Sequence, residues 1–218
     1  MAERGRPRAF DRDEALRRAM VLFWQRGYDG ASLGELTEVM GINRPSLYAA
    51  FGSKEALFRE AVALYDAIEG APIQEKIEQS PTARQAVEAV LRHNARAYVR
   101  TDVPRGCLVV LAALIGTPEH EDLRCFLKEN RKGAEDYLCQ RIARGISDGD
   151  VPATADPAAM AWFYTTVNQG LSIQAKDGAS MEVLDSVVDA AMVAWDGLTA
   201  GTPSTKGTAR AGQNNPSI

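Results

Sequence analysis

Residues 33–51 read LGELTEVMGINRPSLYAAF, and this stretch predicts two short helices joined by a tight turn. Ser32 and Glu35 have the spacing of a capping box, which starts the first helix. Gly41 suits the left-handed conformation that ends it. Asn43 can cap the second helix, whose first turn accepts Pro45 because that nitrogen needs no hydrogen bond there. The pattern is that of a helix-turn-helix.

The second helix has two unlike faces. Leu47 and Phe51 point toward the first helix, whereas the other face carries Arg44, Ser46 and Tyr48 with little apolar bulk. A helix with such a free face fits the major groove of DNA. The alternative is an ordinary helical hairpin inside a core, and the polar free face argues against it.

Helical periodicity continues along the rest of the chain, and no segment alternates with period two. We therefore predict an all-α fold, with a break at Gly70-Ala71-Pro72 and a disordered tail over 199–218. Further helices are expected at 12–26, 53–69, 82–101, 105–116, 119–147, 157–175 and 180–198.

Composition limits the kinds of function. The chain has 25 Lys and Arg against 29 Asp and Glu, and residues 1–60 are net +1 whereas the remainder is net −5. A polyanion would therefore meet the N-terminal part. Three cysteines without CxxC spacing and only two histidines argue against a zinc site, a disulfide framework and an enzyme. We expect no metal and no cofactor.

The chain is expected to work in the cytoplasm. A reducing compartment suits three unpaired cysteines, and charges occupy the place of a signal peptide's apolar segment. The longest apolar run, 107–116, is shorter than the ~20 residues that span a bilayer. No membrane partner is expected.

Residues 10–60 resemble the DNA-binding domain of the TetR-type transcriptional repressors. The runs FWQRGYDGASLGELTEVM (23–40) and GINRPSLYAAFGSKEALFREA (41–61) carry the likeness through G-Y, the Ser before the second helix, the glycine turn, L-Y and F-G-S-K-E. Past residue 70 only the layout is similar. The likeness implies a three-helix helix-turn-helix domain at 11–52, a linking helix at 53–70, and a helical bundle at 71–198 that binds a ligand and dimerises.

The resemblance also implies roles for single residues in the helix-turn-helix. Base edges would be read by Arg44, Pro45, Ser46 and Ala49, and phosphates would be bound by Ser32, Tyr48 and Lys54. Ala49 departs from the bulkier residue that is common in the family, which leaves Arg44 a larger share of the readout or makes the Ala49 methyl a contact to thymine. Tyr48 as a core residue and Lys54 as plain surface stay open.

A basic arm precedes the first helix. Residues 4–8 read RGRPR, and Pro7 favours an extended backbone. Over residues 1–10, Arg4, Arg6 and Arg8 would enter an adjacent minor groove. The alternative is a solvated tail.

The larger domain offers two candidate surfaces. Apolar stripes at 157–175 and 180–198 are interpreted as a dimer interface, or else as internal core, and the interface residues would be Phe163, Val167, Leu184, Val188, Met192 and Trp195. Polar residues among apolar neighbours are candidates for an effector pocket or for satisfied core groups. They are His93, Asn94, Tyr98, Cys107, Tyr137, Asn168 and Gln169.

Cys107 follows Arg105-Gly106 at an expected helix N-terminus. The helix dipole and the guanidinium would lower the pKa of its thiol, which predicts a thiol switch, although a buried apolar role is the alternative. Cys125 and Cys139 are expected in the core.

The sequence therefore predicts a ligand-responsive repressor that binds a palindromic DNA operator as a homodimer and is released by a small-molecule effector. Two alternatives are a sensor of oxidants or electrophiles through Cys107 and an architectural DNA binder without a ligand. An enzyme using Cys107 with a histidine lacks an orienting partner at a recognisable spacing.

Overall fold

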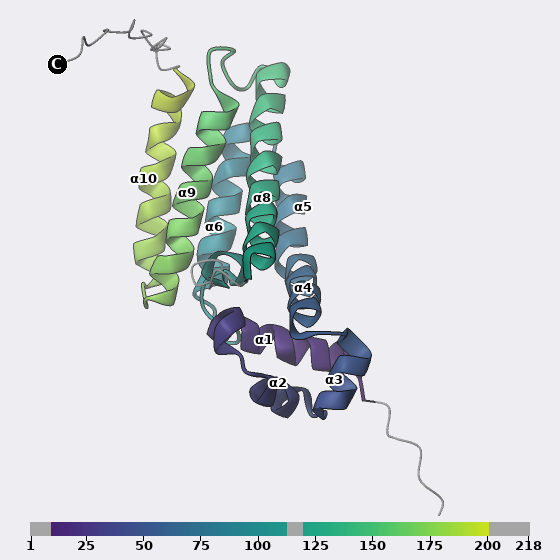
Figure 1. Cartoon of the computed structure of the whole chain (residues 1–218). Helices are drawn as coiled ribbons and strands as arrows, with labels where there is room; N and C mark the ends of the chain where they lie inside the picture. The colour runs from purple at the N-terminus through teal and green to yellow at the C-terminus, as the bar shows by residue number, and fades with distance from the viewer. Residues whose placement is uncertain (1–9, 113–119, 201–218) are drawn as a thin grey trace, which may run out of the picture.

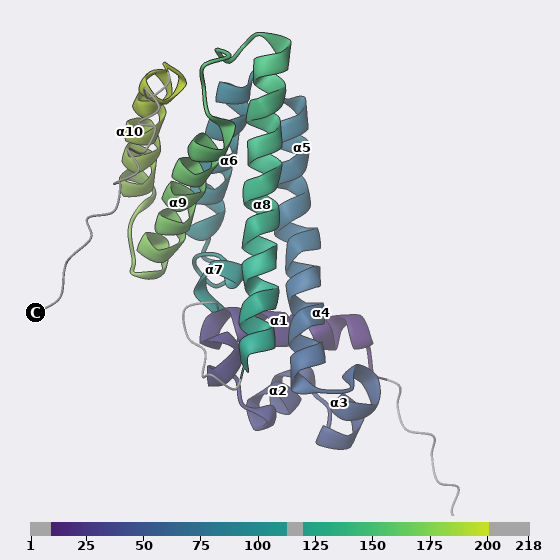
Figure 2. The same ribbon diagram turned by 45° about the horizontal axis from the view of Figure 1, so that its top comes forward.

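The computed structural model describes residues 10–112 and 120–200, and every regular element in those two ranges is a helix. The predicted all-α class is confirmed (Figures 1 and 2). The arm with Arg4, Arg6 and Arg8 lies outside the described residues, as do residues 201–218 of the expected tail. No helix within the described ranges combines the length and the apolar character that a membrane span needs.

The first three helices form the head, residues 10–52. They are α1 (Arg12–Gly30), α2 (Leu33–Met40) and α3 (Arg44–Phe51). The capping box is present at the start of α2, Asn43 caps α3, and Gly41 has a φ of 68°. The backbone leaves the helical conformation at Gly27, where the end of the first helix is predicted, but a further helical turn follows.

A long helical segment leads out of the head. α4 (Lys54–Tyr65) passes through a π-helical turn, η1 (Asp66–Gly70), directly into α5 (Ala71–Gln79). The predicted break at Gly70-Ala71-Pro72 is therefore wrong. Pro72 lies in the first turn of α5, where a proline removes no required hydrogen bond. The π-helical turn η1 joins α4 to α5, so the chain stays helical across the predicted break.

The remaining helices form the body, residues 71–112 and 120–200, together with α5. They are α6 (Ala83–Tyr98), α7 (Leu108–Ala112), α8 (Glu121–Asp148), α9 (Pro157–Lys176) and α10 (Met181–Thr199). α8 packs against α6 and α9, and α10 covers α6 and α9. α7 begins three residues later than predicted, after Gly106 with a φ of 81°.

The hydrophobic core of the head continues into the body. Phe23, Leu47 and Phe58 of the head and α4 share one apolar cluster with Leu108 of α7 and Leu127 of α8. A second cluster lies between α6, α8, α9 and α10. A movement of α7 or α8 therefore acts on the packing of the head.

Candidate DNA-binding surface and effector site

α3 rests on the head by one face and leaves the other free. Leu47 and Phe51 are buried, whereas Arg44 and Ala49 are exposed and Tyr48 has 46% of its surface accessible. The core alternative for Tyr48 is therefore wrong. Pro45 is exposed and Ser46 is half-buried. The face that the sequence assigns to base contacts is open in the folded chain.

Arg12, which the sequence does not single out, fixes the end of α3. Its guanidinium lies 4.4 Å from the centroid of the Phe51 ring and 2.7 Å from a Glu60 carboxylate oxygen, and it donates a hydrogen bond to the Ala50 carbonyl at 3.3 Å. These contacts join the start of α1 to α3 and α4, so both α1 and α4 help to fix the orientation of α3.

Ser32 lies exposed at the N-terminus of α2. Its hydroxyl donates to Glu35 Oε2 at 2.8 Å and accepts from the Glu35 amide at 3.2 Å. Hydrogen bonds from the Ser32 amide and hydroxyl lower the pKa of the Glu35 carboxyl, and Arg26 lies 3.3 Å from that carboxylate. These bonds hold Ser32 and Glu35 in place at the start of α2, where the free backbone amides favour binding of an anion.

Lys54, at the start of α4, is half-buried and lies against an aromatic ring. Its Nζ is 4.3 Å from the centroid of the Tyr28 ring. Burial lowers the pKa of the ammonium, and the charge of Asp29 opposes that shift. Lys54 is therefore not a plain surface residue, because its ammonium lies on the Tyr28 ring and is influenced by the Asp29 charge.

A buried polar cluster occupies the middle of the body. Asn94 donates to Asn168 Oδ1 at 2.9 Å, and Asn168 donates to the Tyr98 hydroxyl at 3.3 Å. Burial and the neighbouring Cys107 raise the pKa of the hydroxyls of both Tyr98 and Tyr65 well above its usual value. The structure thus brings together Tyr98, Cys107 and Asn168. Tyr65 also belongs to this cluster, although its helical spacing fits an ordinary core stripe.

Burial raises the pKa of the Cys107 thiol, while a hydrogen bond from Tyr65 opposes the shift. The predicted lowering is wrong, because enclosure by α4, α6 and α7 outweighs the dipole of the short α7. Cys125 is exposed, contrary to its expected core position, and Cys139 is half-buried against the body core.

The other candidate pocket residues lie apart from this cluster. Tyr137 donates to Glu78 at 2.8 Å and packs with α5, whereas Gln169 is half-buried on α9. His93 is half-buried on α6, and its pKa is lowered by burial and by the nearby Lys76. Two cavities, of about 10 and 410 Å³, lie where α1 meets the body, and none of the predicted pocket residues lines either one.

The apolar stripes of α9 and α10 divide between core and surface. Leu184, Val188, Met192 and Trp195 are buried within the single chain and are not available to a partner. Phe163 and Val167 are half-buried. The exposed apolar side chains of the two helices are instead Trp162, Val183, Val187 and Val193. The stripe predicted as an interface is therefore mainly core, and this second set is the outward face.

The loop before α7 connects the polar cluster to the head. The Trp24 indole of α1 donates to the Gly106 carbonyl at 3.0 Å, and the Cys107 amide donates to Ser172 Oγ of α9 at 2.8 Å. The Trp24 ring also meets the Tyr65 ring edge-on at 4.9 Å between centroids. A change at Cys107 therefore reaches α1 through direct contacts.

The two halves of the chain match the models of one family. Residues 15–61 match the model described as "Bacterial regulatory proteins, tetR family", and residues 83–191 match "Tetracyclin repressor-like, C-terminal domain". The chain belongs to the TetR family. It is a transcriptional regulator that binds DNA through its helix-turn-helix.

Relatives of the chain include repressors and a DNA complex. The repressors ComR and BdcR of Escherichia coli K12 are both 34% identical, over 89% and 83% of this chain and 93% and 86% of their own lengths. A cysteine-substituted form of the TetR family regulator CifR, solved with a 26-bp double-strand operator, is 52% identical. It covers 88% of this chain and 100% of that one with a TM-score of 0.85.

Proposed function

We propose that this TetR-family chain is a repressor that binds a palindromic operator as a homodimer in the cytoplasm. The observation that carries the proposal is the open face of α3 above a buried Leu47 and Phe51. Arg44, with Pro45, Ser46 and Ala49, would read base edges in the major groove. The likeness to CifR, solved with operator DNA, supports this use of the head.

The phosphate contacts would come from three helices. Ser32 lies at the start of α2, Tyr48 lies on the open side of α3, and Lys54 begins α4. Such contacts position the protein on the duplex without reading its sequence. The basic arm with Arg4, Arg6 and Arg8 would add minor-groove contacts beside them.

The homodimer would form through the outward face of α9 and α10. Val183, Val187 and Val193 lie on α10 and Trp162 lies on α9, and all four are exposed in the single chain. Two copies that pair these faces would form a four-helix bundle, which buries apolar surface and places two α3 helices for successive major grooves, about 34–36 Å apart.

The effector would bind beside the buried polar cluster of Tyr65, Tyr98, Cys107 and Asn168. This region touches α4, α6, α7 and α9, so a ligand there acts on the linking helix and the dimer face together. A coupling free energy of about 1–3 kcal/mol between effector and operator would be enough for release.

The thiol-sensor alternative is favoured by the position of Cys107. It directly follows Gly106, whose carbonyl accepts a hydrogen bond from Trp24 of the head. Burial raises the pKa of the thiol, which disfavours the thiolate, the reactive form of cysteine. If Cys107→Ser still responds to a thiol-reactive compound, this alternative fails. Loss of that response with retained operator binding would establish it.

Selection of bound duplexes from random DNA, followed by footprinting, tests the proposal. We expect a short palindrome whose two half-sites are one helical turn apart, protected by a dimer. Salt-sensitive coating of any A·T-rich duplex would instead indicate the architectural alternative.

A further inference from the structure

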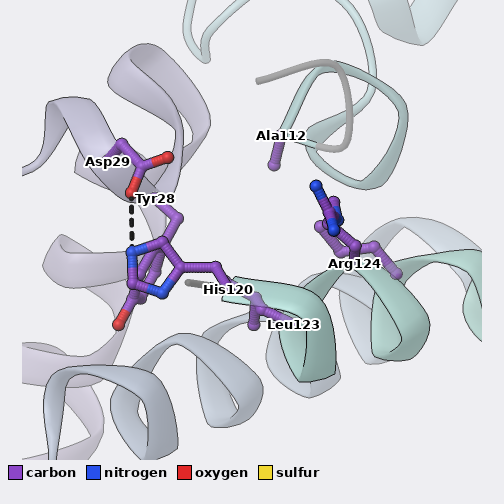
Figure 3. A pocket seen from close by; sticks show the side chains of 7 residues that line it. Tyr28, Asp29, Ala112, His120, Leu123 and Arg124 are labelled. Carbon is purple, nitrogen blue, oxygen red and sulfur yellow. Dashed lines mark ion pairs between the residues drawn. The ribbon is translucent and has the colours of Figure 1, made fainter. Parts of the chain in front are cut away.

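His120 immediately precedes α8 and reaches back to the end of α1. Its Nε2 lies 3.2 Å from Asp29 Oδ1, and its ring meets the Tyr28 ring nearly at right angles with 5.0 Å between centroids. Figure 3 shows the His120–Asp29 pair next to Tyr28. The body therefore touches the head at the residues that also hold Lys54.

Asp29 also lies near a lysine. The Lys54 ammonium lies over the ring of Tyr28, next to Asp29 in the chain, and it experiences the Asp29 charge. The other carboxylate that acts on Tyr28, Glu55, is engaged by Arg59 at 2.7 Å. Asp29 is thus the carboxylate for which His120 and Lys54 compete.

The small cavity beside His120 does not offer a competing explanation. It is lined by Tyr28, Asp29, Ala112 and His120 among others, and its volume of about 10 Å³ is room for one water molecule at most. A small-molecule ligand does not fit there, and the neighbouring cavity of about 410 Å³ shares Tyr28, Asp29 and Ala112 but is not lined by His120. The arrangement acts through the pairing of its side chains.

We propose that His120 is a positioning residue for operator binding, because its contact with Asp29 keeps that carboxylate from pairing with Lys54, whose ammonium rests on the Tyr28 ring and can leave it for a DNA phosphate. The inference rests on the proposed phosphate contact of Lys54. Without His120, the Asp29 carboxylate can turn to Lys54 and form an ion pair with the ammonium, which competes with the phosphate. Because His120 precedes α8, a shift of α8 in the body changes the partner of Asp29 and reaches the DNA contact.

The test measures affinity for the selected operator, and its dependence on salt, in full-length variants. Lys54→Met is expected to weaken binding and to reduce the slope of log affinity against log salt by about one. His120→Ala is expected to weaken binding about twofold to fivefold, the range of a partly exposed ion pair, and to reduce the slope. Adding Asp29→Asn to His120→Ala should restore both quantities.

Several controls separate this role from a structural one. His120→Gln keeps a hydrogen-bond donor for Asp29 and should behave like the wild type, and so should Lys128→Ala and Glu129→Gln at exposed positions of α8. If Asp29→Asn does not rescue His120→Ala, or if His120→Ala binds like the wild type, the positioning role is wrong. If Lys54→Met changes neither affinity nor slope, the phosphate contact itself is wrong.

Discussion

The head and the body are both helical, but different contacts define their helices. In the head, Asp11, Ser32 and Asn43 cap α1, α2 and α3 through their side chains. In the body, side chains also cap α6, α9 and α10, but the 28-residue α8 begins without a side-chain cap, and the loop before α7 is held by bonds that join residues 65 and 82 positions apart. Local signals thus define where the head helices begin, whereas α8 and the loop before α7 depend on distant packing. Surface changes in the head should affect DNA contacts, and changes in the body should affect stability or signalling.

The largest loss of unfolding free energy is expected for Gly106→Ala in the body, and the matched variant in the head is Gly52→Ala. Both glycines have positive φ, but a Cβ at Gly106 would lie 2.8 Å from the Ser172 carbonyl, whereas nothing lies within 4 Å of one at Gly52. Backbone strain of about 1–2 kcal/mol applies to both, and overpacking adds about 1–3 kcal/mol at Gly106 alone. Urea denaturation should show the difference, and equal losses of unfolding free energy would contradict it.

The next effect concerns the two faces of α10. Val193 is 78% exposed, whereas Val188 is fully buried. Val193→Glu should give a folded monomer that binds the operator weakly, because a charge is placed in the proposed dimer face. Val188→Ala should stay dimeric and lose about 1–3 kcal/mol of unfolding free energy.

Light scattering on a sizing column distinguishes the two α10 variants. A dimeric Val193→Glu protein with unchanged operator affinity would show that the exposed face of α10 is not the interface.

The smallest effect is expected at the capping box of α2. Ser32→Ala should cost about 1 kcal/mol of unfolding free energy at neutral pH. Because the pKa of Glu35 is lowered in the folded chain, first through its bond with the Ser32 amide, its contribution is present above the unfolded pKa of the carboxyl. That contribution is lost as the pH falls through the folded pKa.

Ser32→Ala keeps the amide bond to Glu35 but removes the hydroxyl bond, which also lowers the pKa of Glu35. The gap in unfolding free energy between wild type and Ser32→Ala should therefore narrow in acid, which thermal unfolding at a series of pH values can measure. A gap that stays constant from neutral to strongly acid pH would mean that the Ser32–Glu35 pair is not coupled.

The head could be predicted from sequence because its signals are local. Ser32, Gly41 and Asn43 have the expected caps and dihedral angles, and the open side of α3 follows from the spacing of Leu47 and Phe51. Nothing local reveals Arg12, which reaches across 48 positions to Glu60.

The body could be predicted only in outline. Core and outward stripes on α10 share the same helical spacing, so Leu184 and Val183 are distinguished only by what covers them. The proline at 72 indicates a break that the π turn removes. The thiol of Cys107 shows the same limit, since a helix N-terminus predicts a lowered pKa and burial reverses it.

The central claim is that α3 reads bases and that Arg44 does so most strongly. The direct test compares wild type with Arg44→Ala on the selected operator and on duplexes changed at single base pairs. The variant should lose about 1–3 kcal/mol of binding free energy on the operator, together with discrimination at one base pair in each half-site. An equal loss on every duplex, or full discrimination without Arg44, would contradict the claim.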